Sequence, residues 1–160
     1  MAGGRKYSYD DDFFKNINSI SAYWAGFAAA DAYIAENKKH RVCFFGMKLA
    51  EKDLGHIKLF CSDTKYTGKI RSKKEHLNRK VFNQNVIQIT GIKDSWKKDL
   101  LNIYNITPAK SLTLQPPNLT EKEHIFAYIK GLICGDGHIG IHNGYFQIHL
   151  VGSEFIIKWC

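Results

Sequence analysis

The chain has 160 residues, enough for about one domain of ordinary size. Hydrophobic residues make up 44% of it and charged residues 24%, a composition that supports a buried core and excludes a disordered tail, a collagen-like fibre and a small disulfide scaffold. Lys and Arg outnumber Asp and Glu to give a formal net charge of +8, and a basic excess of this size suits a polyanionic partner.

The cysteines and the N-terminal residues indicate a reducing compartment. The four cysteines are widely spaced and form no CxxC pair, so reduced thiols are expected. Residues 1–12 are polar and acidic, where a secretory signal needs an apolar segment. The most apolar stretch, 22–35, contains Asp31 and is shorter than the roughly 20 residues of a membrane helix. We therefore expect an intracellular protein without a membrane partner, in the cytoplasm or in a DNA-containing organelle.

The first part of the chain is predicted to mix helices and strands. A helix over 22–31 has Ser21 as its predicted cap, and Asp53 is the predicted cap of a short amphipathic helix. The other predicted elements are strands over 41–49, 69–71 and 86–90 and a helix over 94–104.

A connector and a second helical segment follow. All prolines fall within 108–117 and mark a connector over about 105–118. Beyond it, a capping box at 120–123 predicts a helix, Asn143-Gly144 predicts the turn of a hairpin, and Ser153 starts a further helix. Helices and strands mixed without regular βαβ units predict an α+β fold.

Two segments of the chain, 22–31 and 127–136, match at an offset of 105 residues. Both begin with Ala-Tyr, both have glycine in the middle, and both end in aspartate. The chain is therefore predicted to contain one complete repeat and the beginning of a second.

The two matching helices are predicted to pack against each other. Each carries small residues one turn apart, namely Gly26 and Ala30 in the first and Gly131 and Gly135 in the second. Such packing brings Asp31 and Asp136 together at the helix ends, where like charges and the helix dipoles repel. This arrangement favours a bound cation, and hard oxygen ligands suit Mg²⁺. The alternative is that both aspartates are ordinary polar caps on buried helices.

Residues 24–32 and 129–137 resemble the two signature helices of LAGLIDADG homing endonucleases, which are intron-encoded, intein-borne or free-standing enzymes. The predicted element order behind the first copy also fits the αββαββα repeat of that family. The resemblance implies an α+β fold with a saddle-shaped antiparallel sheet and two pseudo-symmetric repeats, the second incomplete. It divides the chain into an N-terminal extension (1–20), a first repeat (21–104), a linker (105–119) and the start of a second repeat (120–160).

The function implied by the resemblance is site-specific DNA cleavage, with a metal-dependent double-strand break in a long target. In the family, the last acidic residue of each motif binds metal and directs phosphodiester hydrolysis, and the matching positions are Asp31 and Asp136. The neighbouring carbonyl groups of Ala30 and Gly135 match positions that often help to coordinate the ions. The implied cofactor is Mg²⁺, with Mn²⁺ as a possible substitute.

Two further positions match catalytic residues of the family. Glu51 matches a polar residue at the end of the first long strand, where it would order water, and Lys110 matches a lysine that stabilises charge on the phosphate. The alternative for both is a solvated surface charge.

The chain also departs from the family pattern. The earlier acidic position of the motif holds Ala29 in one copy and Cys134 in the other, and Ala32 replaces a glycine. The remainder of the second repeat is missing. The expected assembly is a monomer with two pseudo-symmetric halves if the chain is complete, or a complex with a complementing chain if it is not.

Basic residues predict a surface for double-stranded DNA. Residues 65–80 contain seven basic residues and only one acidic residue, Glu75. A smaller basic cluster lies at the beginning of the strand over 41–49 and just before it. The predicted DNA-binding residues are Lys38, Lys39, Arg41, Lys65, Lys69, Arg71, Lys73, Lys74, Arg79 and Lys80.

Two other functions remain open at the level of sequence. One is a catalytically silent DNA- or RNA-binding relative, such as an intron maturase or a transcription regulator; the other is a structural module that binds RNA. Both aspartates favour the enzyme, whereas the incomplete second repeat favours the silent relative.

Overall fold

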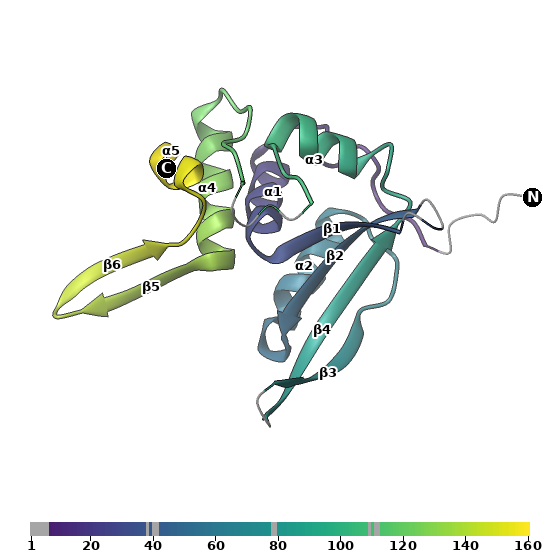
Figure 1. The fold of residues 1–160 in the computed structure, drawn as a ribbon, viewed down its shortest axis with the longest axis horizontal. Helices are drawn as coiled ribbons and strands as arrows, with labels where there is room; N and C mark the ends of the chain where they lie inside the picture. Colours follow the sequence, from purple (N-terminus) through teal and green to yellow (C-terminus); the bar gives the residue numbers. More distant parts are fainter. Residues whose placement is uncertain (1–6, 38, 40–41, 78–79, 109, 111–112) are drawn as a thin grey trace, which may run out of the picture.

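The computed structural model describes residues 7–37, 39, 42–77, 80–108, 110 and 113–160. Its elements are α1 (Ser19–Asp31), β1 (Ala32–Asn37), β2 (Val42–Ala50), the 3-10 turn η1 (Glu51–Asp53), α2 (Leu54–Asp63), β3 (Arg71–Leu77), β4 (Lys80–Thr90), α3 (Trp96–Tyr104), α4 (Lys122–Asp136), β5 (Gly137–His142), β6 (Tyr145–Leu150) and α5 (Glu154–Trp159) (Figure 1). The expected α+β class is confirmed. Within the described part of the chain, no helix is long and apolar enough to cross a membrane.

The larger sheet has four antiparallel strands in the order β1-β2-β4-β3. Alternate residues of β2 and β4 lie on one face and are fully buried, namely Phe45, Met47, Ile87 and Ile89. Phe45 stacks on Phe60 of α2 and meets Trp96 of α3 edge-on. These two helices therefore cover one face of the sheet and form the core with it.

Strand β1 was not among the predicted elements. It follows α1 without a connecting loop and pairs with β2, so that Ala32 lies opposite Met47. Its first residues continue the apolar run of the helix, and periodicity alone does not separate a buried strand from a buried helix.

The hairpin of β3 and β4 is longer than the strands predicted over 69–71 and 86–90. Charged residues dominate β3, so the alternation of apolar and polar residues that indicates a strand is missing there. In Figure 1 this hairpin extends away from the helices. Most of the basic stretch is therefore part of a strand pair and not a loop between strands.

The N-terminal caps of the two repeat helices differ from the prediction. Asn18, and not Ser21, caps α1; Ser21 is the third helical residue and completes a capping box with it. At α4 the predicted capping box does not form, because the cap residue Glu121 makes no side-chain bond there. Glu123 instead accepts a hydrogen bond from the Ser19 hydroxyl and so ties the beginnings of the two helices together.

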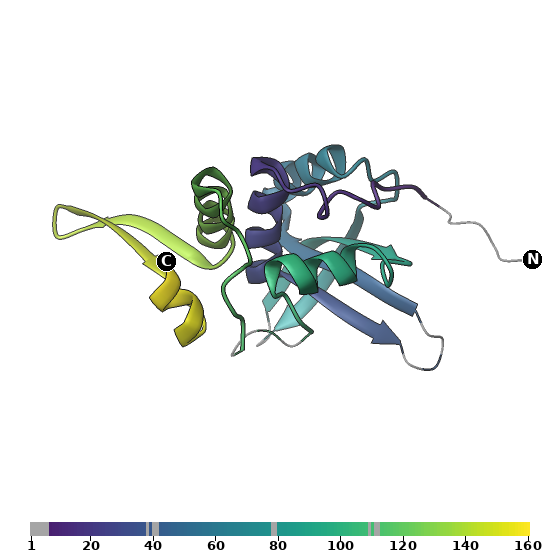
Figure 2. The ribbon, with the colours of Figure 1, turned by 90° about the horizontal axis from the view of Figure 1, so that it is seen from above.

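Helices α1 and α4 pack side by side along their small residues, as predicted. A β-carbon on Gly26 would lie 2.0 Å from the carbonyl oxygen of Tyr128, and one on Gly131 would lie 2.0 Å from that of Tyr23. The backbones approach this closely only because both glycines lack a side chain. Seen from above, β1–β2 and β5–β6 leave the helix pair in opposite directions (Figure 2).

The predicted second hairpin and final helix are also confirmed. Asn143 and Gly144 adopt left-handed conformations, with φ of 51° and 80°, at the turn between β5 and β6. The Ser153 hydroxyl caps α5 by accepting a hydrogen bond from the amide of Ile156. The apolar side chains of the hairpin, Ile139, Ile141, Phe146 and Ile148, are between 52% and 78% exposed.

Candidate active site at the carboxyl ends of the paired helices

The two aspartates predicted to share a site lie at the ends of the paired helices. Asp31 is the last residue of α1, and Asp136 is the last residue of α4. A β-carbon on Gly135 would lie 2.3 Å from the β-carbon of Ala30 and 3.6 Å from Oδ2 of Asp31. The Asp31 carboxylate therefore reaches the end of α4, where Gly135 leaves room for it.

The charge of Asp136 acts on Asp31. Burial raises the pKa of Asp31 above its ordinary value, and the negative charge of Asp136 raises it further. The dipoles of α1 and α4 add partial negative charge at the same place. A cation bound between these groups would relieve this repulsion.

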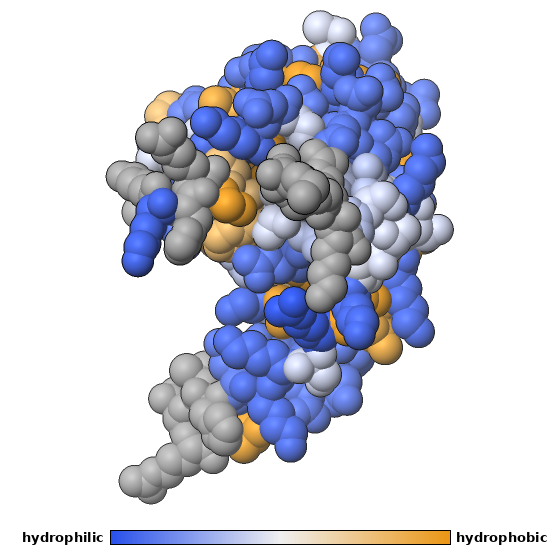
Figure 3. Space-filling model, turned by 90° about the vertical axis from the view of Figure 1, so that its right-hand side faces the viewer, coloured by the Kyte–Doolittle hydropathy of each residue, from blue (hydrophilic) through white to orange (hydrophobic). Residues whose placement is uncertain are grey.

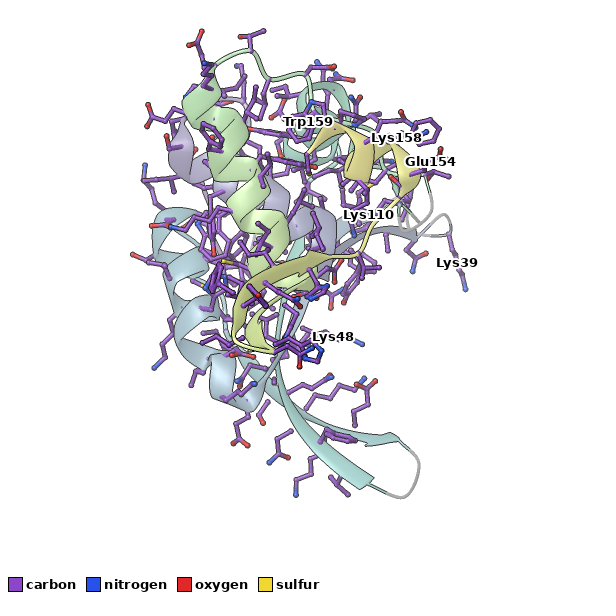
Figure 4. The ribbon with its side chains drawn as sticks, turned by 90° about the vertical axis from the view of Figure 1, so that its left-hand side faces the viewer. Lys39, Lys48, Lys110, Glu154, Lys158 and Trp159 are labelled. Carbon is purple, nitrogen blue, oxygen red and sulfur yellow. The ribbon has the colours of Figure 1, made fainter. Side chains whose placement is uncertain are left out.

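Lys110, from the connector between the halves, lies at the same site. It is 9% exposed, and its Nζ donates a hydrogen bond of 2.6 Å to the carbonyl of Ala32, directly after α1. Burial lowers the pKa of Lys110, whereas the charges of Asp136 and Asp31 raise it. Figure 4 shows Lys110 beside α5. The fold thus brings together three residues that are far apart in the sequence.

Glu51 occupies a different position. Its carboxylate accepts a hydrogen bond of 3.0 Å from the side-chain amide of Asn83, and its carbonyl accepts one of 3.3 Å from Asn85. These bonds hold Glu51 against β4, beyond the end of β2. The charged groups that shift the pKa of Asp31 are Asp136, Lys110 and Asp53, so no described interaction links Glu51 to the aspartates.

Asp53 is an acidic residue near the site that was predicted only as the cap of a helix. It is the cap residue of α2, as expected, but its side chain makes no capping hydrogen bond. Its charge instead raises the pKa of Asp31. Burial lowers the pKa of His56, and the charge of Asp53 acts in the opposite direction. The sequence offers no signal for this role, because aspartate before a helix normally indicates a cap.

The two aspartates fit Mg²⁺ better than they fit an all-protein metal cage. Among the described residues, no three His, Cys, Asp or Glu side chains are grouped to hold a metal ion. Mg²⁺ needs no such group, because it usually keeps several waters and binds one or two carboxylates together with substrate phosphates. Asp31 and Asp136 supply two carboxylates, and Ala30 and Gly135 lie next to them in the chain. Mn²⁺ accepts the same oxygen ligands.

The larger sheet has an uncovered side opposite the helices, which we call the open face. Its residues follow from the strand pairing and form three rows across the sheet: Tyr33, Gly46 and Gln88; Lys48, Val86 and Arg71; Ala50, Gln84 and Lys73. Arg71 and Lys73 are exposed there. Figure 3 shows a hollowed outline between the β3–β4 arm and the rest of the molecule, with hydrophilic side chains on the arm.

Lys48 belongs to the open face and was missed by the sequence analysis. It is an exposed residue of β2 between Met47 and Leu49, which are buried (Figure 4). The sequence did carry a signal for this position. Side chains of a strand alternate between its two faces, so a lysine between two apolar residues indicates the face that is not buried.

The other basic residues predicted to bind DNA are distributed over several surfaces. Lys74 lies on the helix side of β3, opposite Asn83, and Lys65 forms an ion pair of 3.3 Å with Asp10. Lys69 and Lys39 are exposed outside the strands. Lys80 begins β4, and nothing is described of its side chain; Lys38, Arg41 and Arg79 lie outside the described residues.

Comparison of the chain with protein-family models gives no match, and comparison with curated protein sequences gives none either. No relative therefore assigns a role to Asp31, Asp136 or Lys110.

Proposed function

We propose that the protein is a Mg²⁺-dependent endonuclease that cleaves double-stranded DNA at a specific, long target site. The observation that carries this proposal is the meeting of Asp31 and Asp136 at the ends of two helices held together by glycine contacts, with Lys110 beside them. Two carboxylates that repel each other lie in a partly buried site, although this arrangement lowers the free energy of unfolding. A function that needs a bound cation accounts for the arrangement.

The residues of the site have separable roles in this proposal. The carboxylates of Asp31 and Asp136 hold the metal, which when bound polarises the phosphate and supplies an activated water. Lys110 is anchored on the Ala32 carbonyl, and its ammonium group places a fixed positive charge next to the carboxylates. That charge limits the repulsion between the carboxylates in the absence of metal and favours an approaching phosphate.

The open face is the surface proposed to hold the DNA. Strands admitted to the major groove present alternate side chains to the bases and the phosphates. Lys48, Arg71 and Lys73 supply positive charge on this face, and Gln84 and Gln88 supply amide groups able to pair with base edges.

The proposal is tested by incubating the chain with a randomised duplex DNA library in Mg²⁺ and sequencing the new ends. We expect cleavage that is lost in EDTA and reduced at least about 100-fold by Asp31→Asn or Asp136→Asn. Glu154→Gln is the matched control, because Glu154 is an exposed carboxylate that pairs only with Lys158 among the described residues. Cleavage that persists in EDTA or in both aspartate variants would contradict the proposal.

The same experiment distinguishes the enzyme from a silent DNA-binding protein. If the library is bound but never cut in Mg²⁺ or Mn²⁺, the nuclease proposal fails, and DNA binding alone is retained. If structured RNA is bound in preference to duplex DNA, both DNA functions fail.

A further inference from the structure

Three donor groups lie close together on one face of the second hairpin, β5–β6. Strand pairing places His138 opposite His149 and, two residues further along the same face, Gly140 opposite Gln147. The two imidazole rings lie across the strand pair from each other, with centroids 6.3 Å apart and planes inclined at 36°. Nε2 of His149 lies 3.0 Å from Oε1 of Gln147. The His149 ring therefore leans toward the row formed by Gly140 and Gln147.

The ring of His138 leans toward the same row. A β-carbon on Gly140 would lie 2.9 Å from Nε2 of His138, and the two next-nearest atoms belong to the same ring. The imidazole can lie over this residue because glycine has no side chain. Both histidines therefore direct Nε2 to the row that holds the amide of Gln147, and all of these residues line one hollow in the surface.

The donors of this hollow suit a transition metal better than Mg²⁺. Imidazole nitrogen suits Zn²⁺, Cu²⁺ and Ni²⁺, whereas Mg²⁺ takes oxygen ligands. Residues 137–153 contain no Lys, Arg, Asp or Glu, so the hairpin has neither a carboxylate that attracts Mg²⁺ nor a cationic side chain that repels a metal ion. No three His, Cys, Asp or Glu side chains are grouped to hold a metal in the described part of the chain, and the third donor here is instead the amide oxygen of Gln147.

From this geometry we infer that the hairpin binds one Zn²⁺ ion through Nε2 of His138, Nε2 of His149 and Oε1 of Gln147. Water supplies the fourth ligand and completes the tetrahedron that Zn²⁺ prefers. Two such ligands of one Zn²⁺ ion are about 3.4 Å apart, close to the 3.0 Å between His149 and Gln147. Rings bound to the same ion have centroids about 5 Å apart, so the two histidine rings must approach by about 1 Å. Both side chains are exposed and have room for this movement.

Zn²⁺ at this site ties β5 to β6 close to the end of α4. Figures 1 and 2 show the hairpin projecting from that helix. A two-stranded hairpin has little stability of its own, and a ligand that binds only the folded form stabilises it. We therefore expect Zn²⁺ to slow hydrogen exchange of the β5–β6 amides. This effect does not depend on the proposed nuclease activity.

Isothermal titration with ZnCl₂ in excess Mg²⁺ tests the inference on the wild type, His138→Ala, His149→Ala and the matched control His142→Ala. His142 lies on the same face, but none of the three atoms nearest to a β-carbon on Gly140 belongs to it. We expect one Zn²⁺ ion bound to the wild type and to the control, with affinity at least about 10-fold lower in the other two variants. Asp31→Asn is titrated as well, and its Zn²⁺ affinity should equal that of the wild type.

The possible results separate this inference from the proposed function. Equal Zn²⁺ affinity in the wild type, His138→Ala and His149→Ala would overturn the inference, as would an equal loss in His142→Ala. Binding that disappears in Asp31→Asn would also overturn it, because the ion would then lie at the aspartates. Hydrogen exchange of the wild type gives a readout that needs no variant, and exchange of the β5–β6 amides that Zn²⁺ leaves unchanged would contradict the site. A failure of DNA cleavage affects none of these measurements.

Discussion

Individual glycines set the distance between the two repeat helices, and this distance in turn sets the separation of the two aspartates. Gly26 and Gly131 each lie against a backbone carbonyl of the facing helix. A peptide carbonyl cannot move aside as a flexible side chain can, so an added methyl group must push the helices apart. The geometry of the candidate site is thus a consequence of residues that carry no functional group.

Replacing Gly26 by alanine is therefore expected to destabilise the protein by about 1–3 kcal/mol, because the new β-carbon would lie 2.0 Å from the Tyr128 carbonyl oxygen. Gly55→Ala is the matched control. Gly55 lies in α2 with no neighbouring atom within 4 Å of the added carbon, so a stabilisation of up to about 1 kcal/mol is expected. Chemical denaturation measures both. Equal effects of the two substitutions would contradict the close packing of the helices.

Asp31→Asn is expected to stabilise the metal-free protein at neutral pH, although it is expected to reduce the proposed activity strongly. The pKa of Asp31 is raised in the folded state by burial and by Asp136, so the folded protein loses stability as the pH rises from 3.8 through the raised pKa. Above that window the loss is constant, and asparagine removes it. The gain should stay below about 1 kcal/mol, because the carboxylate is partly exposed.

Denaturation curves of the wild type and Asp31→Asn, measured in EDTA between pH 3.5 and 7.5, give this difference directly. The two proteins should converge in stability at the acidic end and separate as the pH rises. An asparagine variant that is less stable than the wild type at neutral pH would show that the carboxylate is favourably paired in the absence of metal.

The aspartates were predictable from the sequence, but their surroundings were only partly so. The repeat at an offset of 105 residues identified Asp31 and Asp136 as a pair, because equivalent positions on two packed helices must lie near each other. Lys110 was predicted from the resemblance alone, since nothing in a proline-containing connector indicates where a side chain will be buried. The charge of Asp53 near Asp31 was not predictable, because it depends on where the fold places the turn between β2 and α2 relative to the end of α1.

At the level of elements, neighbouring residues of β3 face opposite sides of the sheet. Lys73 lies on the open face opposite Gln84, and Lys74 lies on the helix side opposite Asn83. If the open face binds DNA, Lys73→Ala should weaken duplex binding and lower the salt slope by about one, while Lys74→Ala should change neither appreciably. Fluorescence anisotropy with a duplex at several salt concentrations measures both quantities. A larger effect of Lys74→Ala would place the DNA on the other side of the sheet.

The two hairpins that follow the repeat helices differ in how well their apolar sides are covered. Phe45 in β2 is fully buried, whereas Phe146 in β6 is 69% exposed. Phe45→Ala should therefore cost about 3–5 kcal/mol, and Phe146→Ala should change stability by no more than about 0.5 kcal/mol. Thermal or chemical denaturation decides the matter. A large loss in Phe146→Ala would mean that the apolar side of the second hairpin is covered in solution.

How well each element was predicted depended on the strength of its local sequence signal. α3 and the turn of β5–β6 carry strong local signals, a periodic apolar stripe in one and Asn143-Gly144 in the other, and both were predicted. β3 carries charged residues on both sides because it projects beyond the helices, so no burial pattern marks it. The cap of α1 was misplaced by three residues because Asn18 and Ser21 both belong to one capping box.

Over the molecule as a whole, charge is distributed unevenly between the larger sheet and the second hairpin. The first half holds Lys48, Arg71 and Lys73 on its open face, while the second hairpin presents histidine and glutamine at the corresponding place. The acidic site lies between them, where the charge of Asp136 raises the pKa of Asp31. A duplex lying across both faces would therefore pass over the aspartates.

Mn²⁺ titration followed by electron paramagnetic resonance tests the proposal that Asp31 and Asp136 bind one divalent cation jointly. Four proteins are compared: the wild type, Asp31→Asn, Asp136→Asn and the surface control Glu154→Gln. We predict one site that Mg²⁺ competes for, with affinity at least about 10-fold lower in each aspartate variant and unchanged in the control. Equal Mn²⁺ affinity in all four proteins would contradict the claim.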